Sequence, residues 1–336
     1  MRLPPLSVRR PEGLLAAVPY LLGYHPVAAV AVLVLVGGEV VMVSCVNSRD
    51  PVDADDGGER PDGAEYLAKV AVRQRGETTI LVAYCPPAEI ADTARAIRDR
   101  FAAHGLPVAL LLRVEGGRYR REVGGDWEPG EGTPFDPAVT AFAAAATAAG
   151  MVALPDRAAV RRRLSPVDGP GRAAVTHATA QELAAQAGRD PDRQVVAGLA
   201  AVAHVLRRWR AGRGLSDVDV ARASVALRLR DVRDATWRRI TPACADQRAH
   251  VELWSEVARR ARADLVAAPA LLAAFAAFLA GDGTFAGLAC DTALACDPRY
   301  EAALLLDEVL RRGIPPAELR RLAAGGISGT EERPRR

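Results

Sequence analysis

A cysteine at the end of a predicted strand is the first candidate for chemistry. Residues 78–84 are apolar and β-branched, which predicts a buried strand that closes on Tyr84 and Cys85, and Glu89 then opens a predicted helix. Ligands of open α/β sheets bind beside such strand ends, and a helix N-terminus favours a thiolate. Cysteine is also a common buried residue, and no histidine can be assigned as its base. We therefore favour a structural Cys85 thiol, with a reactive one as the alternative.

The N-terminal segment supplies a second set of polar groups. Residues 11–22 predict an apolar helix that kinks or restarts at Pro19, and Gly23 suits its left-handed end. Tyr24 and His25 follow, just before the next apolar stretch. We expect both side chains to satisfy buried backbone groups, so that loss of the imidazole would destabilise the fold. The alternative is that Tyr24 and His25 line a pocket, where His25 would titrate near neutral pH.

Arginine is concentrated at residues 207–210 and 222–239. A basic helix face is typical of nucleic-acid binding, but Asp231 and Asp234 stand at helical spacing from neighbouring arginines and neutralise part of this charge. The net charge of +3 over 336 residues is too small to imply a nucleic-acid or membrane partner. Lys69 is the sole lysine of the chain, so the abundance of arginine reflects codon usage more than function. We favour a solvated, internally paired face over a nucleic-acid surface.

The motifs of common enzymes are missing from the sequence. There is no phosphate-binding loop and no serine nucleophile elbow. Residues 281–286 fit a variant dinucleotide fingerprint, but a helix is predicted before them instead of the required strand, so we interpret them as a turn. We therefore predict no cofactor and no metal. The five cysteines are scattered and odd in number, which indicates reduced thiols and a cytoplasmic location, and the apolar stretches 27–36 and 265–280 are too short for a membrane span.

The pattern of strands and helices predicts an α/β domain followed by an all-helical domain. The N-terminal part combines a hairpin over residues 28–46, a right-handed βαβ unit over 78–114 and a second hairpin that turns at Gly116-Gly117. This gives a mixed sheet with two hairpins. The predicted boundaries are 1–164 for the α/β domain, 165–172 for a linker, 173–324 for the helical domain and 325–336 for a disordered tail.

The helical domain shows apolar periodicity throughout. We expect helices over residues 176–187, 191–210, 217–240, 249–262, 269–280, 285–296 and 299–312. Small residues Ala274, Ala286 and Ala293 lie where the two helices of 269–296 would approach closely, as in one tetratricopeptide-like helical hairpin. Such a domain offers surface for a protein partner.

Two terminal motifs carry a family resemblance. Residues 14–26, Leu-Leu-Ala-Ala-Val-Pro-Tyr-Leu-Leu-Gly-Tyr-His-Pro, and the run 276–316 resemble the two ends of actinobacterial proteins grouped as domain of unknown function 4192. The resemblance implies no activity. Related proteins often carry a cysteine pair before a Gly-Thr-Pro step. Here Gly132-Thr133-Pro134 is present, but Trp127-Glu128-Pro129 stands where those cysteines are expected, which argues against a metal or redox role.

Three functional hypotheses remain. The first is a non-catalytic interaction or regulatory protein that binds a protein partner through its helical domain. The second is an enzyme or small-ligand binder that uses the cleft at the strand ends near Tyr84, Cys85 and Glu89, with its ligand unknown. The third is a nucleic-acid-associated protein that uses the arginine-rich helices.

Overall fold

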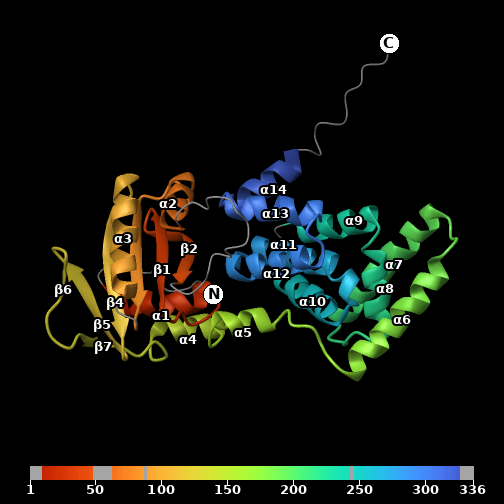
Figure 1. Cartoon of the computed structure of the whole chain (residues 1–336), viewed down its shortest axis with the longest axis horizontal. Coiled ribbons are helices and arrows are strands. Elements are labelled where there is room, and N and C mark those ends of the chain that lie inside the picture. The colour runs from red at the N-terminus through yellow and green to blue at the C-terminus, as the bar shows by residue number, and fades with distance from the viewer. Residues whose placement is uncertain (1–9, 48–62, 87–88, 243–245, 326–336) are drawn as a thin grey trace, which may run out of the picture. The chain divides into compact units, whose positions relative to one another are not determined.

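The computed structural model describes residues 10–47, 63–86, 89–242 and 246–325. The chain forms two compact units, Met1–Val160 and Arg161–Arg336 (Figure 1). The division falls a few residues before the linker expected at 165–172. The predicted polar loop at 50–62 and most of the predicted tail lie outside the described residues.

A mixed sheet forms the centre of the first unit. Its order is β2-β1-β3-β4-β5-β6, with β7 pairing with β5. Strands β3 and β4 are parallel, and every other pair is antiparallel. The strands are β1 (Ala29–Val36), β2 (Glu39–Asn47), β3 (Thr78–Tyr84), β4 (Val108–Glu115), β5 (Arg118–Val123), β6 (Asp126–Trp127) and β7 (Thr133–Pro134). The predicted hairpins and the βαβ unit are confirmed, whereas the two short strands β6 and β7 were not predicted.

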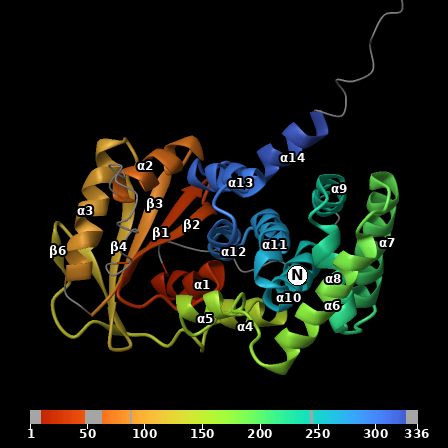
Figure 2. The same cartoon turned by 45° about the vertical axis from the view of Figure 1, so that its right-hand side comes forward.

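Helices pack on the sheet because its central strands are apolar on both faces. Residues Ala29–Leu35 of β1 are almost completely buried, and alternate side chains of a strand point to opposite faces. One face packs against α2 (Gly63–Arg73) and α3 (Glu89–Ala103). Helix α1 (Pro11–Leu22) packs with α4 (Ala141–Ala148) and reaches Tyr119 on the other face of β5. Figure 2 shows the sheet between these helices.

Local sequence signals set the ends of α1. Pro11 occupies the first helical turn, where its missing N–H costs no hydrogen bond, and Gly23 ends the helix with a left-handed φ of 79°. Of the kink or restart expected at Pro19, the restart is wrong, because α1 continues through that residue. Burial explains the difference, since the apolar face of α1 packs on both sides of the proline.

The second unit is all-helical over its described residues. It contains α6 (Pro170–Gln186), α7 (Pro191–Arg210), α8 (Asp217–Ala226), α9 (Arg230–Ile240), α10 (Gln247–Arg260), α11 (Ala267–Ala280), α12 (Gly283–Cys296), α13 (Glu301–Arg311) and α14 (Pro316–Gly325), while α5 (Arg157–Arg162) spans the division between the units. Together with the mixed sheet, this confirms the predicted fold class.

The single helix predicted over residues 217–240 is wrong. It is two helices, α8 and α9, that meet around Leu227 and Leu229. Leu227 is buried and Leu229 adopts an extended backbone that begins α9. No glycine or proline marks this break, so tertiary packing overrides local helical propensity here. Helix α14 was also not predicted.

Close packing of small residues joins α11 and α12. Ala274, Ala286 and Ala293 are fully buried, as the predicted helical hairpin requires. Gly281 closes α11 with a φ of 83°, and Asp282 caps α12 by accepting the Phe285 N–H at 2.9 Å. Residues 281 and 282 therefore form the expected turn after a helix, and 283–286 are the first turn of α12. Within the residues that the structure describes, no helix combines the length and apolar character needed to span a membrane.

Candidate functional site

The end of β3 places Tyr84 and Cys85 beside the end of β4. The Cys85 N–H donates to the Val114 carbonyl at 2.9 Å, which extends the parallel ladder. The hydroxyl of Tyr84 is buried and has no hydrogen-bond partner within the part of the chain that the structure describes. Burial, with the nearby Cys45 as a second cause, raises the pKa of Tyr84 well above its usual range. Tyr84 is thus held as a neutral phenol and is not poised to transfer a proton near neutral pH.

Cys85 is half-buried against the core under α2 and α3. Burial is the largest effect and raises the pKa of its thiol, and Glu115 raises it further, while Arg113 and an amide hydrogen bond from Ala91 act in the opposite direction. Desolvation therefore outweighs the helix N-terminus that the sequence placed nearby. This supports the structural interpretation of Cys85 and speaks against an activated nucleophile.

The other predicted residues, Glu89, Tyr24 and His25, differ in their exposure. Glu89 is exposed in the first turn of α3. Tyr24 is buried and bridges to Leu154, but His25 is exposed, so the expected buried imidazole is wrong. The backbone explains this outcome. The His25 N–H donates to the Leu154 carbonyl at 2.9 Å, and successive side chains of an extended segment alternate, so burial of Tyr24 turns His25 outward.

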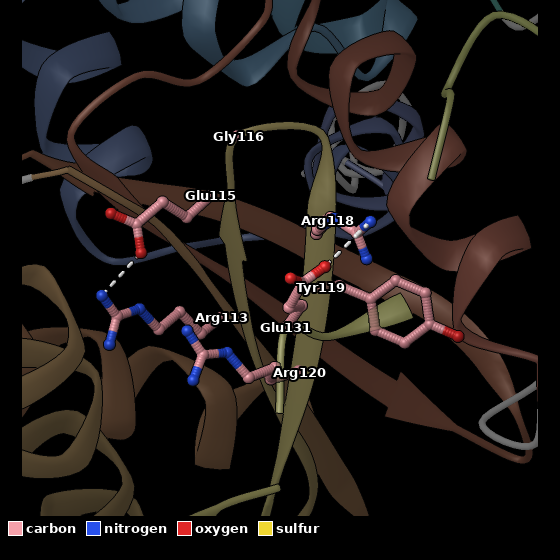
Figure 3. Close-up of a pocket in the computed structure, with 7 residues that line it drawn as sticks. All are labelled: Arg113, Glu115, Gly116, Arg118, Tyr119, Arg120 and Glu131. Carbon is pink, nitrogen blue, oxygen red and sulfur yellow. Dashed lines mark hydrogen bonds and ion pairs between the residues drawn. The ribbon is translucent and has the colours of Figure 1, made fainter. Parts of the chain in front are cut away.

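A pocket of about 350 Å³ lies at the β4–β5 hairpin (Figure 3). Two ion pairs border it: Arg113 Nη2 lies 2.6 Å from Glu115 Oε2, and Arg118 Nη2 lies 3.4 Å from Glu131 Oε2. The pocket is lined by Arg113, Glu115, Gly116, Arg118, Tyr119, Arg120 and Glu131. Sequence reasoning missed these residues, although an arginine at position 113, within an otherwise apolar strand, is a signal that was available.

A larger groove of about 450 Å³ lies on the helical unit, between α9, α13 and α14. Its residues are Arg230, Arg233, Asp234, Trp237, Arg238, Ala302, Leu305, Leu306, Val309 and Leu319. Trp237 is fixed by stacking on Phe275 with ring centroids 3.6 Å apart. We call the apolar members of this set the groove floor and Arg230, Arg233 and Arg238 the groove rim.

The rim arginines are held by short-range contacts. Asp234 pairs with Arg233 at 2.8 Å and with Arg230 at 3.8 Å, and its backbone carbonyl accepts from Arg238 Nε at 3.3 Å. The guanidinium of Arg233 also lies over the Tyr300 ring at 5.6 Å from its centroid. The Asp234 carboxylate therefore pairs with two of the three rim cations, and the rim keeps a net positive charge.

The floor contains a signal that the sequence analysis did not use. Leu304, Leu305 and Leu306 are consecutive, and a helix cannot direct three consecutive side chains into one core. Leu306 is buried, whereas 70% of the surface of Leu305 is exposed. A leucine triplet in an amphipathic helix thus indicated an exposed apolar residue.

A family model described as Domain of unknown function (DUF4192) matches residues 11–317 of the chain. The chain belongs to the DUF4192 family. The match confirms the family resemblance that the terminal motifs carry and spans both structural units. No curated protein and no solved structure matches the DUF4192 chain.

The arginine-rich helices of the DUF4192 protein are partly neutralised. Arg222 pairs with Glu182 at 3.3 Å, and Arg230 and Arg233 share Asp234. Of the helical pairs expected on this face, Arg230–Asp234 is present. Among the side chains described for this protein, no three His, Cys, Asp or Glu residues gather closely enough to hold a metal ion.

Proposed function

We propose that this DUF4192 protein is a cytoplasmic, non-catalytic interaction protein whose helical unit binds an acidic amphipathic helix of a partner. The observation that carries the proposal is an apolar groove floor under a basic rim. Amphipathic helices bind such grooves through apolar residues at helical spacing. The cytoplasmic assignment is supported by the four described cysteines, all of which are free thiols.

The floor supplies the apolar part of the interaction. Leu305 combines high exposure with a place in the groove, beside Leu306, Val309 and the immobile Trp237. Covering a leucine side chain removes apolar surface from water and contributes roughly 1.5–3 kcal/mol. A rigid aromatic residue at the centre of a groove is typical of residues that dominate binding energy.

The rim supplies the preference for acidic partners. Three arginines face one aspartate, and Arg238 contacts only the backbone carbonyl of that residue in the contacts described for it. Arg238 is thus the rim cation whose charge is least compensated. A partner carboxylate beside it gains a charge-assisted hydrogen bond, and an incoming lysine is repelled.

A designed helical peptide tests the proposal on the full chain. One version carries leucines along one face with flanking glutamates, and a matched version carries lysines in place of the glutamates. Fluorescence anisotropy should detect the glutamate peptide, and Leu305→Glu should weaken its binding roughly ten- to hundredfold, as the lost burial predicts. Val196→Glu is the matched control, because Val196 on α7 is 67% exposed and does not line the groove.

Two results would overturn the proposal. Equal binding of the glutamate and lysine peptides would remove the role of the rim. Self-association of the wild-type chain in ultracentrifugation, lost in Leu305→Glu, would assign the groove to a second copy of the chain instead of a partner helix.

A further inference from the structure

Arg113 and Arg120 at the β4–β5 hairpin lie in the α/β unit and take no part in the interaction proposed for the helical unit. We propose that Arg113 and Arg120 form a binding site for a small oxyanion, the phosphate or carboxylate group of a small molecule. The proposal is independent of the groove on the helical unit.

The sheet register brings the two cations together. Arg113 and Arg120 are direct cross-strand partners in the antiparallel β4–β5 pair. Their side chains extend to the same side of the sheet, while Tyr119 points to the opposite side (Figure 3). Like charges in directly opposed positions destabilise a sheet. A bound anion between them reverses this repulsion into attraction.

The protein itself compensates these cations incompletely. Arg113 pairs with Glu115 through Nη2, but its Nε is buried and has no hydrogen-bond partner in the described part of the chain. Arg120 has no carboxylate partner among the described residues. Glu122 follows on the same face of β5 but is already held by Arg95 at 3.2 Å and Arg98 at 2.5 Å. Arg113, which has one unsatisfied donor, and Arg120, which lacks a carboxylate partner among the described residues, therefore line the same pocket.

Gly132 fixes the position of Arg120. A Cβ at this residue would lie 2.7 Å from the Tyr119 carbonyl oxygen and 2.9 Å from Cγ of Arg120, and the φ of Gly132 is +82°. A side chain is therefore excluded here, and the absence of one lets the segment before β7 lie directly against the arginine stem. This contact limits the freedom of Arg120 before any ligand binds, which reduces the entropy that binding must overcome.

The ligand class follows from the donors and the space. Guanidinium groups present planar donor pairs that match phosphate and carboxylate oxygens. The lining holds three arginines against Glu115 and Glu131, a net charge of +1 (3 − 2), and the pocket volume of about 350 Å³ suits a small ligand. The Glu115 side chain is partly exposed and pairs with the Arg113 guanidinium. It therefore competes with an incoming anion for that guanidinium.

Thermal unfolding and calorimetry of the full chain test the site, with sodium phosphate or sodium acetate replacing sodium chloride at constant ionic strength. Phosphate should raise the Tm of the wild type, because a ligand that binds the folded state stabilises it. Arg120→Gln should abolish that rise, and Arg73→Ala, which removes an exposed arginine on α2, should preserve it. A response to acetate alone assigns the ligand group as a carboxylate.

The Glu115→Gln variant tests the site through an expected gain in anion affinity instead of a loss. Removal of the competing carboxylate should tighten phosphate binding severalfold in calorimetry, an effect that a general loss of stability cannot produce. A wild-type Tm unchanged by both anions, or an anion response that survives in Arg120→Gln, would overturn the proposal.

Discussion

The two units hold arginines in different surroundings. In the α/β unit, Arg113 and Arg120 stand opposite each other on neighbouring strands and border a small charged pocket. In the helical unit, Arg230, Arg233 and Arg238 surround an apolar floor. The same residue type therefore suits a small oxyanion in one unit and an acidic amphipathic helix in the other. The surface between the guanidinium groups, a charged pocket in one unit and an apolar floor in the other, decides which class of ligand they suit.

The interiors of the units differ as well. The sheet core is built from aliphatic strand residues covered by helices, and on the other face Tyr119 donates a part-buried hydrogen bond to Glu12. The helical core buries His250, whose Nδ1 accepts from Trp254 Nε1 at 3.2 Å. This comparison predicts that the two units lose stability in different pH ranges.

The largest expected effect is the loss of Trp254. This residue is fully buried in α10, and Trp254→Ala should destabilise the helical unit by about 3–5 kcal/mol through the cavity and the lost apolar burial. Urea denaturation measures the free energy of unfolding, and hydrogen exchange assigns the loss to a unit. Trp127→Ala is the control, since Trp127 is half-buried in β6 and contacts Arg95 by a cation–π interaction. A loss as large for Trp127 would contradict the central place given to Trp254.

The helical unit should be sensitive to mild acid through His250. Burial first, and Arg210 second, lower the pKa of His250 from 6.5 to about 4. Because the unfolded chain binds the proton more readily, this contribution to stability is complete above pH 6.5 and is lost as the pH falls toward 4, up to about 3 kcal/mol. Urea denaturation across this range should show the slope in the wild type and its disappearance in His250→Gln. A slope that persists in the variant would contradict this assignment.

The α/β unit should respond at lower pH through Glu12. The hydrogen bond from Tyr119 at 2.5 Å is the main reason that the pKa of Glu12 lies below 4.5. Stability from this pair is present above pH 4.5 and is lost as the pH falls through the lowered pKa. Tyr119→Phe should cost about 1.5–2 kcal/mol near neutral pH and flatten this acid response. If unfolding of Tyr119→Phe, monitored by hydrogen exchange, shows the same acid response as the wild type, Glu12 is not the group that makes the stability of this unit depend on pH.

The smallest expected effect is an increase in the stability of the α/β unit. Arg120→Gln relieves the cross-strand repulsion with Arg113 in the absence of a ligand and should stabilise the α/β unit by about 0.2–1 kcal/mol in anion-poor buffer. Chloride-free urea denaturation measures this change, with Arg73→Ala as a charge-matched control. A destabilised Arg120→Gln variant would show that the arginine pair is not under repulsion.

Local patterns predicted much of the fold because they are strong here. The apolar strands, the paired glycines between β1 and β2 and the helix over residues 191–210 all have short-range causes, and each is confirmed. The break between α8 and α9 has no such signal: no glycine or proline stands there, and Leu227 at the break is buried. The same limit applies to the fate of His25, which depends on pairing with Leu154.

The candidate sites were predicted less well, for a related reason. The sequence pattern indicated Cys85 as a candidate functional residue, although its burial raises the pKa of the thiol. It did not indicate the neighbouring Arg113. Arg113 and Arg120 become a pair only through the register of β4 and β5, and Leu305 and Arg238 line one groove only in the folded helical unit. Chemistry that arises from long-range pairing leaves little trace in the spacing of residues.

Hydrogen-exchange mass spectrometry with both probes tests the central comparison most directly. Sodium phosphate added to the full chain should slow exchange in β4 and β5 and leave α9, α13 and α14 unchanged. The glutamate-flanked amphipathic peptide should slow exchange in α9, α13 and α14 and leave the hairpin unchanged. Protection of the same segments by both probes, or of neither set, would contradict the assignment of two arginine-lined sites to two different classes of ligand.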